Sequence, residues 1–204
     1  MVGQTVAQYA RAGVAALHLE DQVVQKRCGH LAGKEIVSEE EYLTRIRAAV
    51  HMRTKLGSNI VIIARTDALQ SMGFDNAISR MKKARALGAD VIFVEALETV
   101  EQAKKVCEIF KGTPVMYGMV QGSKSPQISV EEAQALGIRI IVFAALSLGP
   151  VYQSVTKAMR TLKSTGRAER LETIRPHDVF KVCGMDELME FDRAAGGGSF
   201  NGEC

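Results

Sequence analysis

Five short apolar segments recur along this chain, and each is followed by a stretch whose apolar residues have helical spacing. Turn residues bound each segment, and its apolar residues are nearly continuous, which is typical of strands buried on both faces of a parallel sheet. The segments span residues 14–19, 60–64, 91–94, 114–120 and 138–145. The sequence therefore predicts an α/β fold made of repeated strand–helix units.

Helix signals separate the predicted strands. Ser38, with Glu41 three residues later, has the spacing of a capping box, and apolar residues follow at helical spacing. Further helices are expected at residues 5–12, 75–87, 99–110, 129–136 and 151–162. Such units form either an open doubly wound sheet or a closed barrel, and both place functional residues at the carboxyl ends of the strands.

The pattern changes after residue 165. A charged segment leads into two short helices, expected at residues 176–183 and 186–193, and then into a glycine-rich end. We therefore expect residues 1–165 to form the strand–helix part. Residues 166–204 are expected to form a C-terminal helical extension with a flexible tail.

Composition excludes several classes of function. The 204 residues are 47% hydrophobic and 24% charged, as in an ordinary globular protein. The net charge of +3 comes from basic and acidic residues spread along the chain, so we expect neither a nucleic-acid nor a membrane partner. Four separated cysteines favour reduced thiols. We expect a soluble cytoplasmic protein, or a mitochondrial one if the natural chain has a longer N-terminus.

Polar side chains follow the first three predicted strands. Glu20 and Asp21 follow the first, Arg65 and Asp67 the second, and Glu95 the third. A carboxylate such as Glu20 suits a hard cation, and a guanidinium suits a carboxylate substrate. A glutamate in an apolar setting acts as an acid or base of raised pKa. An ion pair between Arg65 and Glu95, and a solvated or paired Glu20, are the structural alternatives.

The loop after the first strand reads Lys-Arg-Cys-Gly-His at residues 26–30. Cationic neighbours stabilise a thiolate, so Cys28 is a candidate proton donor and acceptor or nucleophile, with an inert surface thiol as the alternative. Gly29 allows the backbone to approach a ligand closely.

Other polar and sulfur-containing residues carry weaker signals. The loop after the fourth strand places Ser123 and Ser125 where they could contact an anion, although most such loops are only turns. His18 lies within a predicted strand, and Cys107 and Cys183 lie on predicted helices, so we expect all three to be core residues.

Three segments together resemble the isocitrate lyase and phosphoenolpyruvate mutase superfamily. They are Leu-Glu-Asp-Gln at 19–22, Lys-Arg-Cys-Gly-His at 26–30 and Ala-Arg-Thr-Asp-Ala at 64–68. The similarity extends from about Thr5 to about Phe200. The cysteine loop is specific and points to the branch of lyases and hydrolases that cleave carbon–carbon bonds, rather than to the phosphonate mutases.

The resemblance implies a fold, a chemistry and an assembly. The fold would be a (β/α)₈ TIM barrel, of which residues 1–165 hold about the last five βα units. The reaction would be Mg²⁺- or Mn²⁺-dependent cleavage of a 2-hydroxy or 2-oxo dicarboxylate or tricarboxylate through an enolate. Oxaloacetate, 2-methylisocitrate and dimethylmalate are the candidate substrates. The assembly would be a homo-oligomer, a dimer or a tetramer, that exchanges C-terminal helices.

The resemblance also implies residue roles. Cys28 would be the acid or base on a mobile loop, and Arg65 would bind the 2-oxo acid portion of the substrate. Glu95 would support proton transfer, and Gly29 and His30 would hold a substrate carboxylate. The metal ion and Arg65 would stabilise the enolate while Cys28 protonates the departing carbanion.

The chain departs from the family at three places. The family barrel begins with three strands that carry the metal-binding aspartates, and this chain begins at the helix before the fourth, so Glu20 is the metal ligand that it retains. Gly118 stands where the family usually has Asn, and Ala144 where it has Pro or Ser. These departures favour an alternative: a truncated, catalytically inactive homologue or an interaction partner.

Overall fold

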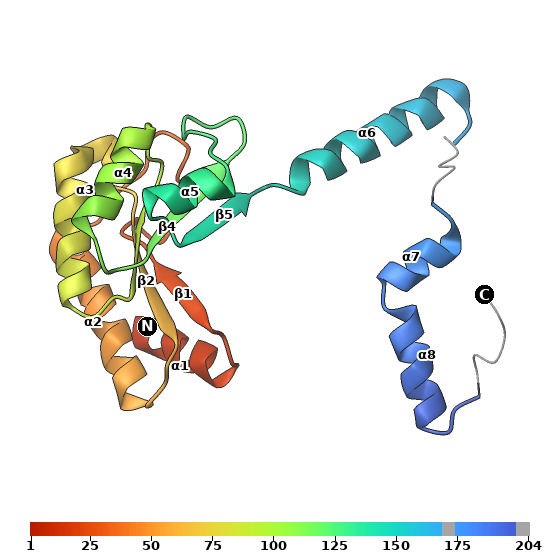
Figure 1. Cartoon of the computed structure of the whole chain (residues 1–204), viewed down its shortest axis with the longest axis horizontal. Coiled ribbons are helices and arrows are strands. Elements are labelled where there is room, and N and C mark those ends of the chain that lie inside the picture. The colour runs from red at the N-terminus through yellow and green to blue at the C-terminus, as the bar shows by residue number, and fades with distance from the viewer. Residues whose placement is uncertain (169–173, 199–204) are drawn as a thin grey trace. The chain divides into compact units, whose positions relative to one another are not determined.

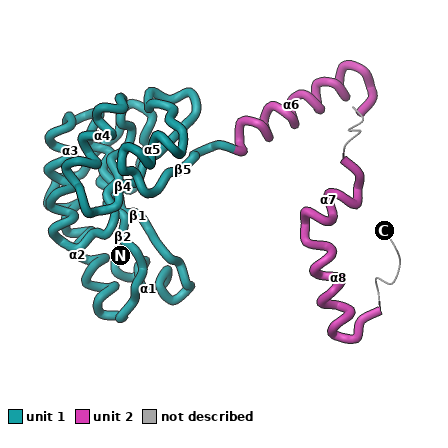
Figure 2. Tube along the Cα trace, viewed as in Figure 1, with its two compact units in different colours: residues 1–146 teal, residues 147–204 magenta. Residues whose placement is uncertain are grey.

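The computed structural model of the chain describes residues 1–168 and 174–198. Residues 1–146 and 147–204 form two units (Figure 2). The second unit begins just before α6 (Leu148–Thr165), earlier than the boundary predicted after residue 165. Helix α6 has no buried residue.

The first unit contains all five predicted strands, with ends shifted by a few residues (Figure 1). They are β1 (Ala16–Leu19), β2 (Val61–Thr66), β3 (Val91–Val94), β4 (Val115–Val120) and β5 (Ile140–Ala144). Its helices are α1 (Val2–Arg11), α2 (Glu39–Lys55), α3 (Leu69–Ala86), α4 (Val100–Ile109) and α5 (Val130–Leu136).

The five strands are parallel and lie in sequence order, β1-β2-β3-β4-β5. Helices α2, α3, α4 and α5 lie on one side of this sheet (Figure 1), and one apolar cluster joins them to that face. A doubly wound sheet has helices on both faces, so this winding is that of a barrel wall. The predicted fold class is confirmed: the chain holds a five-stranded parallel sheet of a (β/α)₈ barrel together with the helices that cover it.

Helix caps account for several element boundaries. The Ser38 hydroxyl accepts a hydrogen bond from the amide of Glu41 at the start of α2, and Ser129 forms a complete capping box with Glu132 at the start of α5. Helix α3 begins earlier than the predicted residue 75. A first turn precedes Gly73, whose φ of 81° interrupts the helix.

The other face of the sheet, here called the inner face, is only partly covered. Its apolar cluster consists of Ile63, Val91, Phe93 and Met116. His18 lies beside Ile63 in the register of β1 and β2, and it is exposed, so its prediction as a core residue was wrong. The reason is that β1 is an edge strand. Strand β5 is the other edge of the sheet. It was predicted to be buried on both faces, but none of its residues is buried.

The second unit contains α6, α7 (Pro176–Val182) and α8 (Met185–Ala194). None of these three helices has a buried residue, so the prediction of Cys183 as a core thiol was wrong. Cys204 and the end of the predicted tail lie outside the described residues. No helix among residues 1–168 and 174–198 is long and apolar enough to cross a membrane.

Candidate active site

The carboxyl ends of β1, β2 and β3 bring the predicted polar residues together. Arg65 lies opposite Phe93 in the register of β2 and β3, so Glu95, two residues further on, follows the end of the neighbouring strand. Glu20 directly follows β1. Parallel strands end at the same edge of a sheet, so the rule that locates sites in βα folds accounts for this meeting of side chains.

Arg65 is the centre of the cluster. Its Nε and Nη2 donate to the two carboxylate oxygens of Asp67 at 2.8 and 3.1 Å. Its Nε also lies 3.2 Å from Glu20 Oε2, and its Nη1 lies 3.4 Å from Glu95 Oε2. The guanidinium carbon is 5.2 Å from the centre of the Phe93 ring. The ion pair that the sequence left as an alternative is therefore present.

The surroundings raise the pKa values of both Arg65 and Glu95. Burial opposes the charge of Arg65, but hydrogen bonding to Asp67 and the charge of Glu95 raise the pKa of Arg65 above its ordinary value. Burial also raises the pKa of Glu95, and the positive charge of Arg65 opposes this effect only in part. The cluster thus combines a permanent cation with a carboxyl group whose proton is held more tightly than usual.

The loop that carries Cys28 is tied to the site at its base. The side-chain amide of Gln22 donates to the carbonyl of Arg27 at 3.0 Å and accepts from the amide of Arg27 at 3.1 Å. Gln22 also pairs with Ile36 in an isolated antiparallel bridge, which closes the loop. Buried Lys34 donates its ammonium to the carbonyl of Gly29 and lies 3.6 Å from Asp67. The Cys28 side chain is exposed.

The Gly29–His30 part of this loop lies directly on the cluster. His30 Nε2 is 2.8 Å from Glu95 Oε1, although the contact lacks hydrogen-bond geometry and Nε2 has no hydrogen-bond partner. A Cβ atom at Gly29 would lie 2.7 Å from Arg65 Nη2 and 2.8 Å from the carboxyl carbon of Glu95. A side chain at position 29 would displace Arg65 or Glu95, so glycine allows the loop to close on both residues where they stand.

A second buried ion pair, between Asp21 and Arg80, holds Asp67 of the Arg65 cluster. Asp21 accepts hydrogen bonds from the Thr66 hydroxyl at 2.6 Å and from the Asp67 amide at 2.8 Å. Arg80 of α3 lies 3.3 Å from Asp21 and also donates to the carbonyl of Val37 at 3.1 Å. Burial raises the pKa of Asp21. Arg80 and Asp21 therefore fix Asp67 and the end of the Cys28 loop at the same time.

The loop after β4 is held by its own contacts. The Tyr117 hydroxyl donates to the carbonyl of Pro126 at 2.9 Å, and the Ser123 hydroxyl accepts from the amide of Ser125 at 3.2 Å. The Ser125 hydroxyl is buried without a partner. The structure shows how the two predicted serines are placed, and their role as ligands of an anion stays a prediction.

The residues present fit a metal ion poorly. Glu20 Oε1 is buried and lacks a hydrogen-bond partner, so one carboxylate oxygen is available. The carboxylates of Asp21 and Asp67 are occupied by arginine and backbone donors. Across the described ranges, no three His, Cys, Asp or Glu side chains are placed to hold a metal ion. These residues do not form a Mg²⁺ site by themselves.

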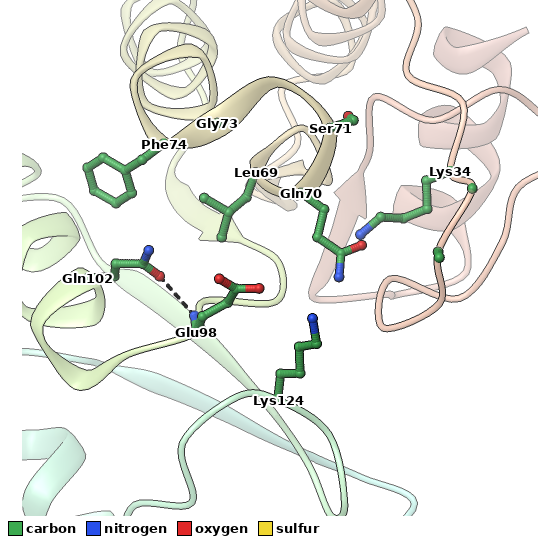
Figure 3. A pocket seen from close by; sticks show the side chains of 11 residues that line it. Lys34, Leu69, Gln70, Ser71, Gly73, Phe74, Glu98, Gln102 and Lys124 are labelled. Carbon is green, nitrogen blue, oxygen red and sulfur yellow. Dashed lines mark hydrogen bonds between the residues drawn. The ribbon is translucent and has the colours of Figure 1, made fainter.

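A pocket of about 570 Å³ lies next to the cluster. Lys34, Gln70, Glu98 and Lys124 point toward one another across it (Figure 3). The amide of Glu98 donates to the side chain of Gln102 at 2.8 Å on its far wall. Neither Arg65 nor Glu95 lines the pocket. Lys34 lines it and also lies 3.6 Å from Asp67 of the cluster.

Sequence reasoning located Glu20, Gly29, His30, Arg65 and Glu95, which the structure brings together. It missed two cations, Lys34 and Arg80. Arg80 left a signal, because it is a charge on the apolar face of α3, where buried arginines need a partner. Lys34 left none, since a lysine in a polar loop looks like a surface residue.

Comparisons with known proteins agree with this geometry. A family model described as phosphoenolpyruvate phosphomutase matches residues 1–163. The 2,3-dimethylmalate lyase of Eubacterium barkeri is 38% identical over 193 residues, covering 94% of this chain and 66% of the relative. The 2-methylisocitrate lyase of Shewanella oneidensis is 34% identical over 201 residues, covering 94% of this chain and 68% of the relative.

Solved structures extend the likeness to the fold. A crystal structure of 2,3-dimethylmalate lyase superposes with a TM-score of 0.95 at 46% identity, covering 100% of this chain and 68% of that protein. Oxaloacetate acetylhydrolase bound to 3,3-difluorooxalacetate gives a TM-score of 0.93 at 45% identity, covering 98% and 67%. The chain thus spans about two thirds of the length of these relatives, 66% for the first of them.

Proposed function

Because the chain belongs to the phosphoenolpyruvate mutase and isocitrate lyase superfamily, we propose that its buried ionic cluster serves carbon–carbon bond cleavage. The substrate class is a 2-hydroxy or 2-oxo dicarboxylate or tricarboxylate. One observation carries the proposal: Arg65, Glu95, Gly29 and the His30 side chain meet at the carboxyl end of a barrel wall, and Gly29 and His30 directly follow Cys28 in the same loop.

Arg65 is suited to bind a substrate carboxylate. A guanidinium has five N–H donors, and Asp67 takes the one on Nε and one on Nη2. The remaining donors include both on Nη1, on the side of Glu95. Asp67 and Lys34 hold each other in place behind it, so Arg65 is oriented before a ligand arrives. A planar carboxylate is the group that such a fork binds best.

Glu95 and Cys28 are suited to move protons. In cleavage of a 2-hydroxy acid, Glu95 takes the hydroxyl proton, and the adjacent carbon–carbon bond breaks to give a 2-oxo acid and an enolate. Cys28 then donates its proton to the enolate carbon, which completes a product carboxylic acid. The raised pKa of Glu95 makes it a stronger base than an exposed glutamate. The positive charge of Arg65 stabilises the developing enolate.

Relatives suggest which substrates to test. Proteins similar to this chain are named for 2,3-dimethylmalate, 2-methylisocitrate and oxaloacetate. Mg²⁺ belongs to the proposal only as an ion to which Glu20 would contribute one oxygen.

A homo-oligomer is proposed as well, supported by Val151, Tyr152 and Val155, which are exposed on α6 at helical spacing.

The test is a cleavage assay on the three compounds with two matched variants. Cys28→Ala is expected to lower kcat by about a hundredfold or more, because it removes the proton donor. Cys183→Ala, an exposed thiol on the second unit, is expected to leave kcat unchanged. Equal rates in the wild type and Cys28→Ala would contradict the role of Cys28. A wild type that cleaves none of the three compounds would support the inactive homologue instead.

A further inference from the structure

The pocket next to the Arg65 cluster carries charges that the proposed cleavage does not use. Segments that follow four consecutive strands, β1 to β4, contribute one polar residue each to its lining, namely Lys34, Gln70, Glu98 and Lys124. The volume of about 570 Å³ is large enough for a small organic molecule.

Two of these charges face the same space without being paired. The side chains of Glu98 and Lys124 point toward one another across the pocket (Figure 3), but no ion pair joins them. Among residues 1–168 and 174–198, neither side chain has a hydrogen-bond or ion-pair partner. A ligand that carries a negative and a positive group complements this arrangement, whereas a simple anion meets the repulsion of Glu98.

Part of the lining is apolar. Leu69 and Phe74 line the pocket on the side of α3, and both pack against the main apolar cluster of the unit. Figure 3 shows these two side chains beside Glu98. An apolar group of a ligand that lies against them is removed from water.

We propose that this pocket binds an α-amino acid with an apolar side chain, and that the bound amino acid steadies the loop that carries Cys28. The ligand carboxylate pairs with Lys124, its ammonium group pairs with Glu98, and its side chain lies on Leu69 and Phe74. This site goes beyond the proposed cleavage and does not depend on it.

Lys34 connects the pocket with the cysteine loop. Its ammonium group donates to the carbonyl of Gly29, which directly follows Cys28, and lies 3.6 Å from Asp67. An ammonium group has three N–H donors, so one remains for a ligand carboxylate. A carboxylate held by Lys34 and Lys124 joins the cysteine loop to the loop after β4. The exposed Cys28 thiol should then react more slowly with a soluble reagent.

Titration calorimetry with three probes tests the site. The probes are L-leucine, 4-methylpentanoate, which lacks the ammonium group, and 3-methylbutylamine, which lacks the carboxylate. We expect a dissociation constant of about 1 mM or tighter for L-leucine and binding at least about tenfold weaker for the other two.

Two variants remove the charges one at a time. Lys124→Met and Glu98→Gln are each expected to weaken L-leucine at least about tenfold, and both change exposed side chains, so the variants should fold. Lys82→Met and Glu101→Gln, which also change exposed side chains but lie outside the pocket, are the matched controls and should leave binding unchanged.

Alkylation by iodoacetamide, followed by mass spectrometry of peptides, tests the link to the loop. Saturating L-leucine is expected to slow alkylation of Cys28 at least about threefold and to leave exposed Cys183 unchanged. Absence of L-leucine binding, or equal binding of the three probes, overturns the site. An unchanged rate at Cys28 with L-leucine bound overturns the link to the loop. Neither measurement requires cleavage, so the two proposals fail separately.

Discussion

The two faces of the sheet differ in what their side chains contact. The helix-covered face contributes residues such as Ile92, Val115 and Tyr117 to one apolar cluster that reaches α2, α3, α4 and α5. The inner face carries a smaller apolar cluster, and Arg65 and Glu95 lie at its carboxyl edge. The difference teaches that stability and chemistry are separated across one sheet, so substitutions on the two faces should have different consequences.

Arg80 of α3 pairs with buried Asp21, and its loss should have the largest effect on stability. Arg80→Met leaves Asp21 buried without its cation, which is expected to cost about 3–5 kcal/mol of unfolding free energy. Urea denaturation measures this loss. Arg47→Met, which removes an exposed arginine of α2, is the control and should stay within about 0.5 kcal/mol. A loss below about 1 kcal/mol for Arg80→Met would show that the buried Arg80–Asp21 pair contributes little to stability.

Truncation of the helix-covered face should come next. Ile92 is fully buried, so Ile92→Ala is expected to cost about 2–5 kcal/mol. Ile140 is 37% exposed on the edge strand β5, and Ile140→Ala should cost less than about 1.5 kcal/mol. Thermal and urea unfolding of the matched pair measure the difference. Equal losses would mean that the edge is as well packed as the centre.

The ionisation of Glu95 should change the free energy of unfolding by less than these two substitutions, and the change should depend on pH. Its pKa is raised in the folded state, so the folded state holds this proton more tightly than the unfolded state. The stability linked to it is present below the ordinary value of 4.5 and is lost as pH rises through the raised pKa. Glu95→Gln cannot ionise, so its stability relative to the wild type is expected to increase between pH 4 and pH 8.

Urea unfolding at several pH values tests this sign. Glu40→Gln, which removes an exposed negative charge on the outside of α2, is the control for a general charge effect. If the stability of Glu95→Gln minus that of the wild type stays constant or falls with rising pH, burial does not raise the pKa of Glu95.

The smallest effect on stability is expected from the addition or removal of Mg²⁺. Glu20 offers a single free oxygen, so titration calorimetry should give a dissociation constant of roughly 1 mM or weaker for this chain. EDTA should leave the Tm unchanged. Micromolar binding that disappears in Glu20→Gln would show that the described residues form a metal site after all.

Much of the site could be predicted because parallel strands all end at one edge. Given five strands, the residues after each strand must meet, and this rule placed Glu20, Arg65 and Glu95 together. Close approach of the loop was expected from Gly29, where a side chain would displace Arg65 or Glu95. Helix boundaries were predictable where a cap defines them, as at Ser38, and not at Gly73, where a glycine interrupts α3 after its first turn.

The sequence was less informative where burial depends on distant neighbours. The apolar run of β1 is the same whether or not another strand covers it, so His18 was assigned to a core that the edge strand lacks. The prediction of Cys183 as a core thiol failed for the same reason, because helix α7, which it follows, has no buried residue. Lys34 could not be found, because its partners, Gly29 and Asp67, are brought to it only by the folded loop.

The proposed cleavage depends on Arg65 binding a substrate carboxylate beside Glu95. The most direct measurement is the dissociation constant of oxalate, a small dicarboxylate, for the wild type and for Arg65→Lys, with thermal unfolding to confirm that both proteins fold. Lysine keeps the charge and loses the planar fork. We expect oxalate to bind the wild type, and Arg65→Lys to weaken this binding by about tenfold or more. Equal affinity in the two folded proteins would contradict it.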